Sequence, residues 1–255
     1  MSNLSRTDSW SNPDGELHAM GRLLDPMRFP YFHRVLTETL LHSPEELSVL
    51  DVGCGGGSMS LLFARAGFRV TGVDADAAAI DSARTRAIQE NVEVQFDTAF
   101  AESLPYGAST FDVVVCSEVL EHVANLERAL DEVYRVLRFG GVLLFSTPNR
   151  TILSRILLVK VAQDWKPTRV MSEVEHRYDR LIRPDELVAQ LSARGIDTYV
   201  IEGVGIPLGS IPVVLRTYFD FKLGRVTLSD LARSMNLKIG RNRSLAYIGW
   251  GVKYS

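Results

Sequence analysis

The chain has 255 residues, of which 46% are hydrophobic and 23% charged, and its formal net charge is -3. This composition excludes a disordered chain, a collagen and a disulfide scaffold, which need a lower apolar fraction, far more glycine or far more cysteine. Cys54 and Cys116 are the two cysteines, and their spacing is not that of a metal or disulfide framework. No apolar signal core or spanning segment is visible, so we expect a cytoplasmic protein.

The charge is unevenly distributed along the chain. Residues 147–172 carry a net charge of +4 and residues 206–255 a net charge of +6, so the rest of the chain is strongly acidic. General nucleic-acid binders have an overall basic excess, and we therefore expect no nucleic-acid partner. The chain thus consists of two basic segments within a sequence that is otherwise acidic.

The elements expected in chain order begin with a polar N-terminal region. An amphipathic stretch over Arg28–Leu41 predicts a leading helix within an N-terminal helical cap of residues 1–45. Residues 46–147 then alternate short β-branched runs with helical patterns. This alternation predicts an α/β fold, a doubly wound Rossmann-like sheet of parallel strands with helices on both faces.

The pattern becomes less regular after residue 147. We expect helices over Ile152–Val161 and Pro184–Arg194, and late strands over residues 197–204 and 244–253. The whole chain, 1–255, is expected to form a single domain. Residues 148–183 and 206–241 are then expected to cover the substrate as a lid or to contact a membrane.

A glycine-rich turn follows the first predicted strand. Asp51 precedes Gly53-Cys54-Gly55-Gly56-Gly57, and glycine is needed where the backbone bends sharply against a ligand. Asp74 lies 21 residues after Gly53, at the end of the second strand, where a carboxylate can accept both hydroxyls of a ribose. Together these residues predict a ligand that contains a nucleoside. The alternative is a structural glycine turn with an acidic cap at the strand end.

This block resembles motif I of the class I S-adenosylmethionine-dependent methyltransferases. A narrower resemblance, over about residues 10–195, is to the ubiquinone-biosynthesis O-methyltransferases, which methylate polyprenylated catechols and hydroquinones. It rests on five blocks in the same order: DGELHAMGRLLDPMRFPYF, VLDVGCGGG, CSEVLEHV, FSTPNRT and HRYDRLIRPDEL. The resemblance implies a seven-stranded sheet with the last strand antiparallel, and S-adenosylmethionine as cofactor.

The resemblance also implies positions for the cofactor contacts. Arg28 is expected on the methionine carboxylate, Gly53 under the methionine part and Ser117 near the adenine or the sulfonium. Asp74 is expected on the ribose, as the residues alone already suggest. The other residues of the expected cofactor site are Asp51, Gly55, Phe100 and Ala101, of which the last two match the segment that lines the adenine.

Glu118, Glu121 and His122 follow the fourth strand. On a helical turn these positions would project from one side, where they could hold a divalent ion such as Mg²⁺, and in the resembling family this block is associated with a metal needed for activity. The alternative is that Glu121 or His122 only anchors the turn by hydrogen bonds.

Two histidines are candidate catalytic bases, because an imidazole can take the proton of a phenol. One is His122 and the other is His176, which precedes Pro184 by eight residues, the spacing of the histidine near the acceptor pocket in the resembling family. A structural role for the loop histidine is the alternative.

Residues 151–171 combine apolar side chains with a tryptophan and several cations. Such a segment suits peripheral contact with an anionic inner membrane. It also suits a helix that packs on the core or caps the pocket, and both alternatives stay open.

The sequence thus predicts an S-adenosylmethionine-dependent O-methyltransferase of a hydroxylated aromatic, most like a polyprenyl catechol or hydroquinone. The expected partner is this small aromatic acceptor; the oligomeric state stays open. One alternative is an O-methyltransferase of another small molecule, such as a natural-product phenol or a sugar. A second alternative is a non-catalytic cofactor-binding partner protein.

Overall fold

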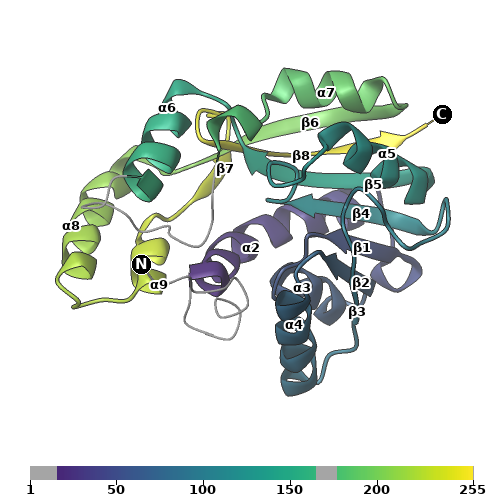
Figure 1. The fold of residues 1–255 in the computed structure, drawn as a ribbon, viewed down its shortest axis with the longest axis horizontal. Coiled ribbons are helices and arrows are strands. Elements are labelled where there is room, and N and C mark those ends of the chain that lie inside the picture. Colours follow the sequence, from purple (N-terminus) through teal and green to yellow (C-terminus); the bar gives the residue numbers. More distant parts are fainter. Residues whose placement is uncertain (1–15, 165–176, 255) are drawn as a thin grey trace.

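A computed structural model of the chain describes residues 16–164 and 177–254. Within them, one eight-stranded sheet has the order β3-β2-β1-β4-β5-β8-β6-β7 (Figure 1). The strands are β1 Ser48–Val52, β2 Arg69–Asp74, β3 Gln95–Thr98, β4 Phe111–Ser117, β5 Leu137–Pro148, β6 Ile196–Gly205, β7 Lys238–Gly240 and β8 Ala246–Lys253. The longer helices are α2 Glu16–Arg34, α3 Ser58–Arg65, α4 Ala77–Glu90, α5 Leu126–Val136, α7 Pro184–Ser192, α8 Ile211–Lys222 and α9 Leu228–Ser234.

The first five strands are parallel and β8 is inserted antiparallel between β5 and β6. The predicted α/β class and the antiparallel last strand are therefore confirmed. The expected number of seven strands is wrong by one, because β7 pairs with the end of β6. Strand β7 spans three residues, which is too short to show an alternation of apolar and polar residues.

Helices cover both faces of the sheet. On one face α5 and α7 contribute Leu130 and Leu187 to the core, and on the other α2 and α3 contribute Phe32 and Phe63. All four side chains are fully buried. Figure 1 shows the two layers, with α2, α3 and α4 on the opposite side of the sheet from α5 and α7. The dense apolar runs of the central strands are thus shielded from water on both sides.

The N-terminal helix begins earlier than expected. The prediction placed it at Arg28–Leu41, whereas α2 runs from Glu16 to Arg34 and a π-helical turn, Val35–Thr39, follows. Proline usually ends a helix because it lacks the backbone N–H. Here Pro26 and Pro30 are both exposed, and the opposite side of α2 is buried against the sheet. That burial favours a continuous helix across Arg28.

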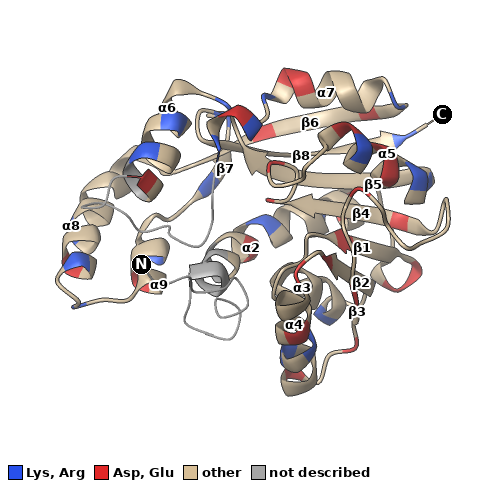
Figure 2. Cartoon of the chain, viewed as in Figure 1, with Lys and Arg blue, Asp and Glu red and all other residues tan. Residues whose placement is uncertain are grey.

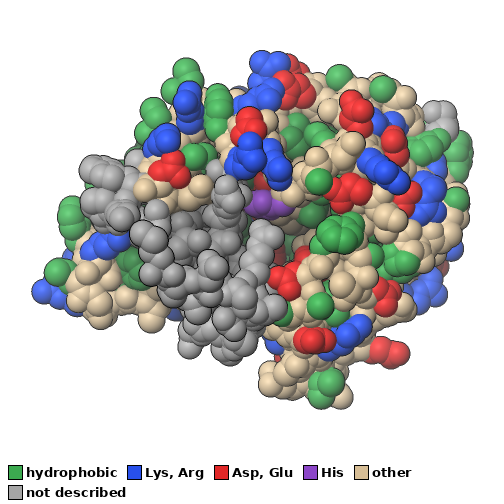
Figure 3. Space-filling view, viewed as in Figure 1, with side chains coloured by type: hydrophobic (Ala, Val, Ile, Leu, Met, Phe, Trp, Pro, Cys, Tyr) green, Lys and Arg blue, Asp and Glu red, His purple; other side chains and the backbone are tan. Residues whose placement is uncertain are grey.

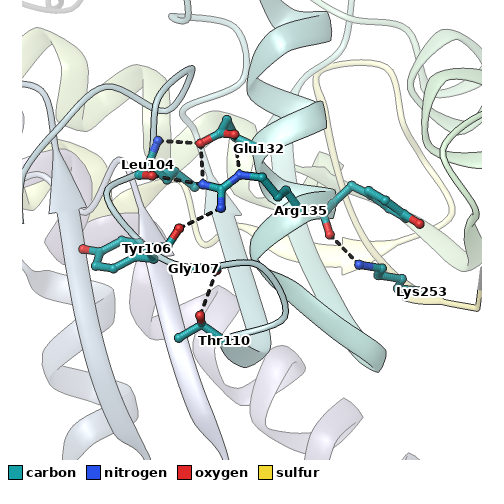
Figure 4. A network of polar contacts seen from close by, with 8 residues as sticks. Leu104, Tyr106, Gly107, Thr110, Glu132, Arg135 and Lys253 are labelled. Atoms are coloured by element: carbon teal, nitrogen blue, oxygen red, sulfur yellow. Dashed lines mark hydrogen bonds and ion pairs between the residues drawn. The ribbon is translucent and has the colours of Figure 1, made fainter.

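An arginine network ties the loop after β3 to α5 (Figure 4). Arg135 pairs with Glu132 at 2.7 Å and donates to the carbonyl oxygens of Tyr106 and Leu104 at 2.7 and 3.0 Å. Glu132 in turn accepts a 2.7 Å hydrogen bond from the Leu104 N–H. The loop that leads away from the carboxyl end of β3 is therefore held by polar contacts as well as by packing.

The segments after β5 and β6 lie beside the sheet rather than on its faces (Figure 1). The expected helix over Ile152–Val161 is a short α6, Ile152–Ser154, that continues as a π-helix, Arg155–Asp164. Short 3-10 turns lie at Pro44–Glu46, Tyr178–Arg180 and Leu208–Ser210.

In the described part of the chain, no helix combines the length and apolar character that a membrane crossing requires.

Candidate functional site

A loop of glycines joins β1 to α3 at the carboxyl edge of the sheet. Gly53, Gly55 and Gly57 all have φ between 50° and 75°, a conformation that other residues rarely adopt. A Cβ atom at Gly53 would also lie 2.3 Å from Cγ2 of Val119. The sequence therefore needs glycine here, and Gly53 and Gly55 are the half-buried members of the loop.

Asp51 lies beneath this loop and is almost completely buried. Its carboxyl accepts a 2.5 Å hydrogen bond from the Ser60 hydroxyl in the first turn of α3. Burial raises the pKa of Asp51 to about 7, because a buried carboxylate loses its hydration. Asp51 thus links β1 to α3 and places an acidic group next to the glycine loop.

Asp74 ends β2 beside the same loop. Its two oxygens accept 2.9 Å hydrogen bonds from the N–H groups of Gly55 and Asp76. Each carboxylate oxygen has a further lone pair, so Asp74 can still accept the two hydroxyls of a ribose. The Ala99 N–H donates to the Asp74 carbonyl at 3.0 Å, which brings the next loop alongside.

That loop carries Phe100 and Ala101. The Phe100 side chain is 66% exposed, and Ala101 is half-buried against the hydrophobic core. Phe100 follows Ala99, which is hydrogen-bonded to Asp74, and its exposed aromatic ring is a surface on which a base can stack. The Glu102 carboxylate accepts from the N–H groups of Ala124 and Asn125, which fixes the loop against the segment after β4.

Arg28 reaches the carboxyl end of β4 from α2 and is only 2% exposed. Its Nη2 lies 2.7 Å from Glu118 Oε1, and its Nη1 donates to the Ser117 hydroxyl at 3.3 Å. The Nε atom is buried and, within the described residues, has no hydrogen-bond partner. A buried donor without a partner is costly, and a ligand carboxylate could satisfy it.

Glu121 and His122 lie at the start of the loop after β4. Glu121 is buried and accepts a 2.8 Å hydrogen bond from the Thr147 hydroxyl of β5. Burial, and secondarily the neighbouring Glu118, raise the pKa of Glu121 well above its usual range. The His122 side chain is 32% exposed, and its Nε2 lies 3.8 Å from Glu121 Oε1.

The three residues expected as metal ligands are not arranged as the sequence predicted. Glu118 has a left-handed backbone, with φ of 57°, so Glu118, Glu121 and His122 do not project from one side of a helical turn. Glu118 is also paired with Arg28. In residues 16–164 and 177–254, no group of three or more His, Cys, Asp or Glu side chains is placed to hold a metal ion. Glu118, Glu121 and His122 are nevertheless neighbours, since His122 Nε2 lies 3.8 Å from Glu121 Oε1 and Glu118 acts on Glu121, so their role as metal ligands stays a prediction.

The expected cofactor residues do come together at one edge of the sheet. Gly55 and Asp74 are in contact, and Arg28 contacts Ser117. The half-buried Gly53 and Gly55, the acid at the end of β2 and Arg28 Nε, which has no hydrogen-bond partner among residues 16–164 and 177–254, fit the methionine and ribose parts of S-adenosylmethionine. His176, the other candidate base, lies outside the described residues.

Sequence reasoning missed three polar residues of this region: Asp25, Ser60 and Thr147. Ser60 and Thr147 contact acids that are close only in the folded chain. Asp25 had a usable signal, because it precedes Arg28 by three residues and so lies on the same side of a helix.

Comparisons with known proteins show the family to which the chain belongs. The model of a methyltransferase domain matches residues 50–145. A ubiquinone biosynthesis O-methyltransferase of Agrobacterium fabrum is 33% identical over 77% of this chain and 79% of its own length, and one of Rhizobium leguminosarum bv. trifolii is 34% identical over 74% and 76%. The crystal structure of an S-adenosylmethionine-dependent methyltransferase from Methanosarcina mazei has a TM-score of 0.59 at 20% identity and covers 88% of this chain and 97% of its own, which shows the shared fold. The chain therefore belongs to the ubiquinone biosynthesis O-methyltransferase family of S-adenosylmethionine-dependent methyltransferases.

Proposed function

We propose that this methyltransferase methylates a hydroxyl group of an aromatic acceptor in quinone biosynthesis, a polyprenyl catechol or hydroquinone. The observation that carries the proposal is the likeness, at 33% identity over 77% of the chain, to relatives named for that O-methylation. The acidic, glycine-lined cofactor site at the carboxyl edge of the sheet supports it.

In this proposal the cofactor lies along that edge. Arg28 binds the methionine carboxylate, the loop of Gly53 and Gly55 allows a close approach, and Asp74 accepts the ribose hydroxyls. Asp51 supports the loop from below. Phe100, Ala101 and Ser117 line the adenine and the sulfonium end.

S-adenosylmethionine supplies a methyl group that is already activated as a sulfonium. The protein then has to orient the acceptor oxygen and take up its proton, and orientation alone contributes up to roughly 7–11 kcal/mol in favourable systems. His122 is the described side chain suited to the proton, because it is partly exposed at the site and has the buried Glu121 beside it. His176 is the second candidate base.

The acceptor side is proposed to be formed by residues 148–183 and 206–241, within a single domain. Exposed apolar side chains of α6 and the following π-helix include Ile152 and Ile156, and α8 exposes Leu215 and Phe219. Figure 3 shows hydrophobic side chains beside Lys and Arg over the α6 end of the molecule. This combination supports peripheral contact with an anionic bilayer, from which a prenylated acceptor would enter.

The acceptor class is tested by comparing substrates. We expect kcat/KM for a short-chain prenyl catechol to exceed that for catechol without the tail by at least about tenfold, because each buried CH₂ contributes about 0.8 kcal/mol. Natural-product phenols and sugars form the comparison set. Preferential methylation of one of these, with no gain from a prenyl tail, would overturn the proposed acceptor and leave the family intact.

A further inference from the structure

Helix α2 carries a buried acidic side chain, Asp25, and a buried basic side chain, Arg28, on one face. Asp25 is 8% exposed and Arg28 is 2% exposed. Residues three apart on a helix lie about 5–6 Å apart at Cβ and face the same way. The pair can therefore hold two charges of opposite sign that are close together in one ligand.

Asp25 and Arg28 have different neighbours. The Asp25 carboxyl lies near Ser58, the first residue of α3 directly after the glycine loop, and the Ser58 side chain lowers the pKa of Asp25. Arg28 instead contacts Ser117 and Glu118 at the end of β4. A Cβ atom on Gly21 would lie 3.4 Å from Asp25 Oδ2, so the carboxyl is enclosed by α2 itself on that side.

Acids outnumber bases around this point. The negative charges of Asp25 and Asp74 both raise the pKa of Asp51. In the same way, the charge of Glu118 raises the pKa of Asp25. The cations that act on Asp25 are Arg28 and Arg86, and both have other partners. Burial raises the pKa of Asp25 to about 6, which means that the negative charge of this carboxylate is costly where it lies. A ligand with a positive group would relieve it.

We propose that Asp25 binds the α-ammonium group of the cofactor's methionine part, while Arg28 binds the carboxylate on the same carbon. Asp74 is already proposed to hold the ribose hydroxyls, and Asp51 lies on β1, where it is bonded to Ser60 of α3. Asp25 is the acid that shares a helix face with Arg28. The inference rests on the proposed placement of the cofactor at this edge and is independent of the acceptor's identity.

A purely structural role for Asp25 makes a different prediction. The carboxyl could serve only to join α2 to the start of α3, since carboxylates are favourable near helix N-termini. In that case its loss would weaken the binding of every adenosine ligand to the same extent, or would lower stability and leave binding unchanged.

Calorimetry with three ligands separates these roles. S-adenosylhomocysteine carries both charged groups, its deaminated analogue keeps the carboxylate alone, and 5′-methylthioadenosine lacks both. For Asp25→Asn we expect at least about tenfold weaker binding of S-adenosylhomocysteine, the size of one charge-assisted hydrogen bond. The other two ligands should bind the variant and the wild type within about a factor of two.

Asp25→Ser serves as a second variant if the amide disturbs folding, and the ratio of affinities is read in the same way. Arg28→Met is the mirror control, because it should weaken both ligands that carry the carboxylate. Equal loss for all three ligands, or unchanged binding of S-adenosylhomocysteine, would overturn the role of Asp25. If the three ligands bind as expected but no aromatic acceptor is methylated, the proposed acceptor is wrong, whereas the role of Asp25 as the ammonium ligand is still supported.

Discussion

At the residue scale, the buried arginine of α2 is the part of the site most sensitive to change. Arg28 pairs with Glu118, and its Nε has no hydrogen-bond partner in the part of the chain that the structure describes. Its loss would remove the proposed carboxylate contact and leave Glu118 without its cation, and breaking a buried pair costs roughly 3–5 kcal/mol.

We therefore expect Arg28→Met to raise KM for S-adenosylmethionine by at least about tenfold, measured by initial rates. The matched control is Arg65→Met, because Arg65 pairs with Glu90 on the exposed surface. Exposed pairs contribute about 0–1 kcal/mol, so this variant should keep a near-normal KM. An unchanged KM in Arg28→Met would contradict the placement of the methionine end.

The buried acids give the ligand-free enzyme a defined pH dependence. Burial raises the pKa of Asp51 to about 7 and that of Asp25 to about 6, from the usual 3.8. At a pH between 3.8 and the raised pKa of each group, that carboxyl is protonated in the native state and ionised in the unfolded chain. These two groups therefore lower stability as the pH rises from about 4 to 7, and the full cost is present above that range.

Asp51→Asn removes one of these groups and keeps an oxygen that can accept from Ser60. We expect the variant to gain in melting temperature over the wild type, and to gain more at pH 8 than at pH 5. Thermal unfolding of both proteins without ligand measures this difference. A gain that is larger at pH 5 would contradict the raised pKa.

At the element scale, the sequence predicted well where a local pattern carries the information. The apolar runs of β1, β4 and β5 and the glycines after β1 depend on neighbouring residues, and the structure confirms the sheet they imply. The start of α2 was misplaced because the prediction followed the local amphipathic pattern of Arg28–Leu41, whereas tertiary burial decides how far a helix extends. The geometry of Glu118 and Glu121 depends on Arg28 and Thr147, which are far away in sequence.

The Arg135 network gives a prediction for the loop between β3 and β4. Arg135→Met removes a pair with Glu132 and two hydrogen bonds to loop carbonyls, so we expect a loss of about 2–3 kcal/mol in the free energy of unfolding, measured in urea. Arg233→Met is the control, because Arg233 forms a pair of the same spacing with Asp230 on an exposed face. Equal losses in the two variants would show that the loop contacts contribute nothing.

At the scale of the whole molecule, the charge pattern read from the sequence has a spatial counterpart. Figure 2 shows Lys and Arg on α6, α8 and β7, at one side of the sheet. Among these elements α8 has no buried residue and exposes Phe219 by 65%. An apolar helix surface with neighbouring cations is the arrangement that binds anionic lipid surfaces.

Vesicle sedimentation tests this surface. We expect the wild type to bind vesicles that contain anionic lipid more strongly than neutral vesicles, and Leu215→Ser with Phe219→Ser to reduce this binding at least about tenfold, since each buried side chain contributes about 1.5–3 kcal/mol. Ile88→Ser is the control, because Ile88 is 81% exposed on α4, on a different helix. Unchanged binding in the double variant would assign these helices to capping the acceptor pocket alone.

In the proposed function, this site transfers a methyl group from S-adenosylmethionine to a hydroxylated aromatic. The most direct measurement is transfer of radiolabelled methyl to a short-chain prenyl catechol by the purified protein, with Arg28→Met in parallel. We predict a labelled O-methyl product from the wild type and a much slower reaction from the variant. Binding of S-adenosylmethionine without any labelled catechol product would contradict the proposed O-methylation of a catechol.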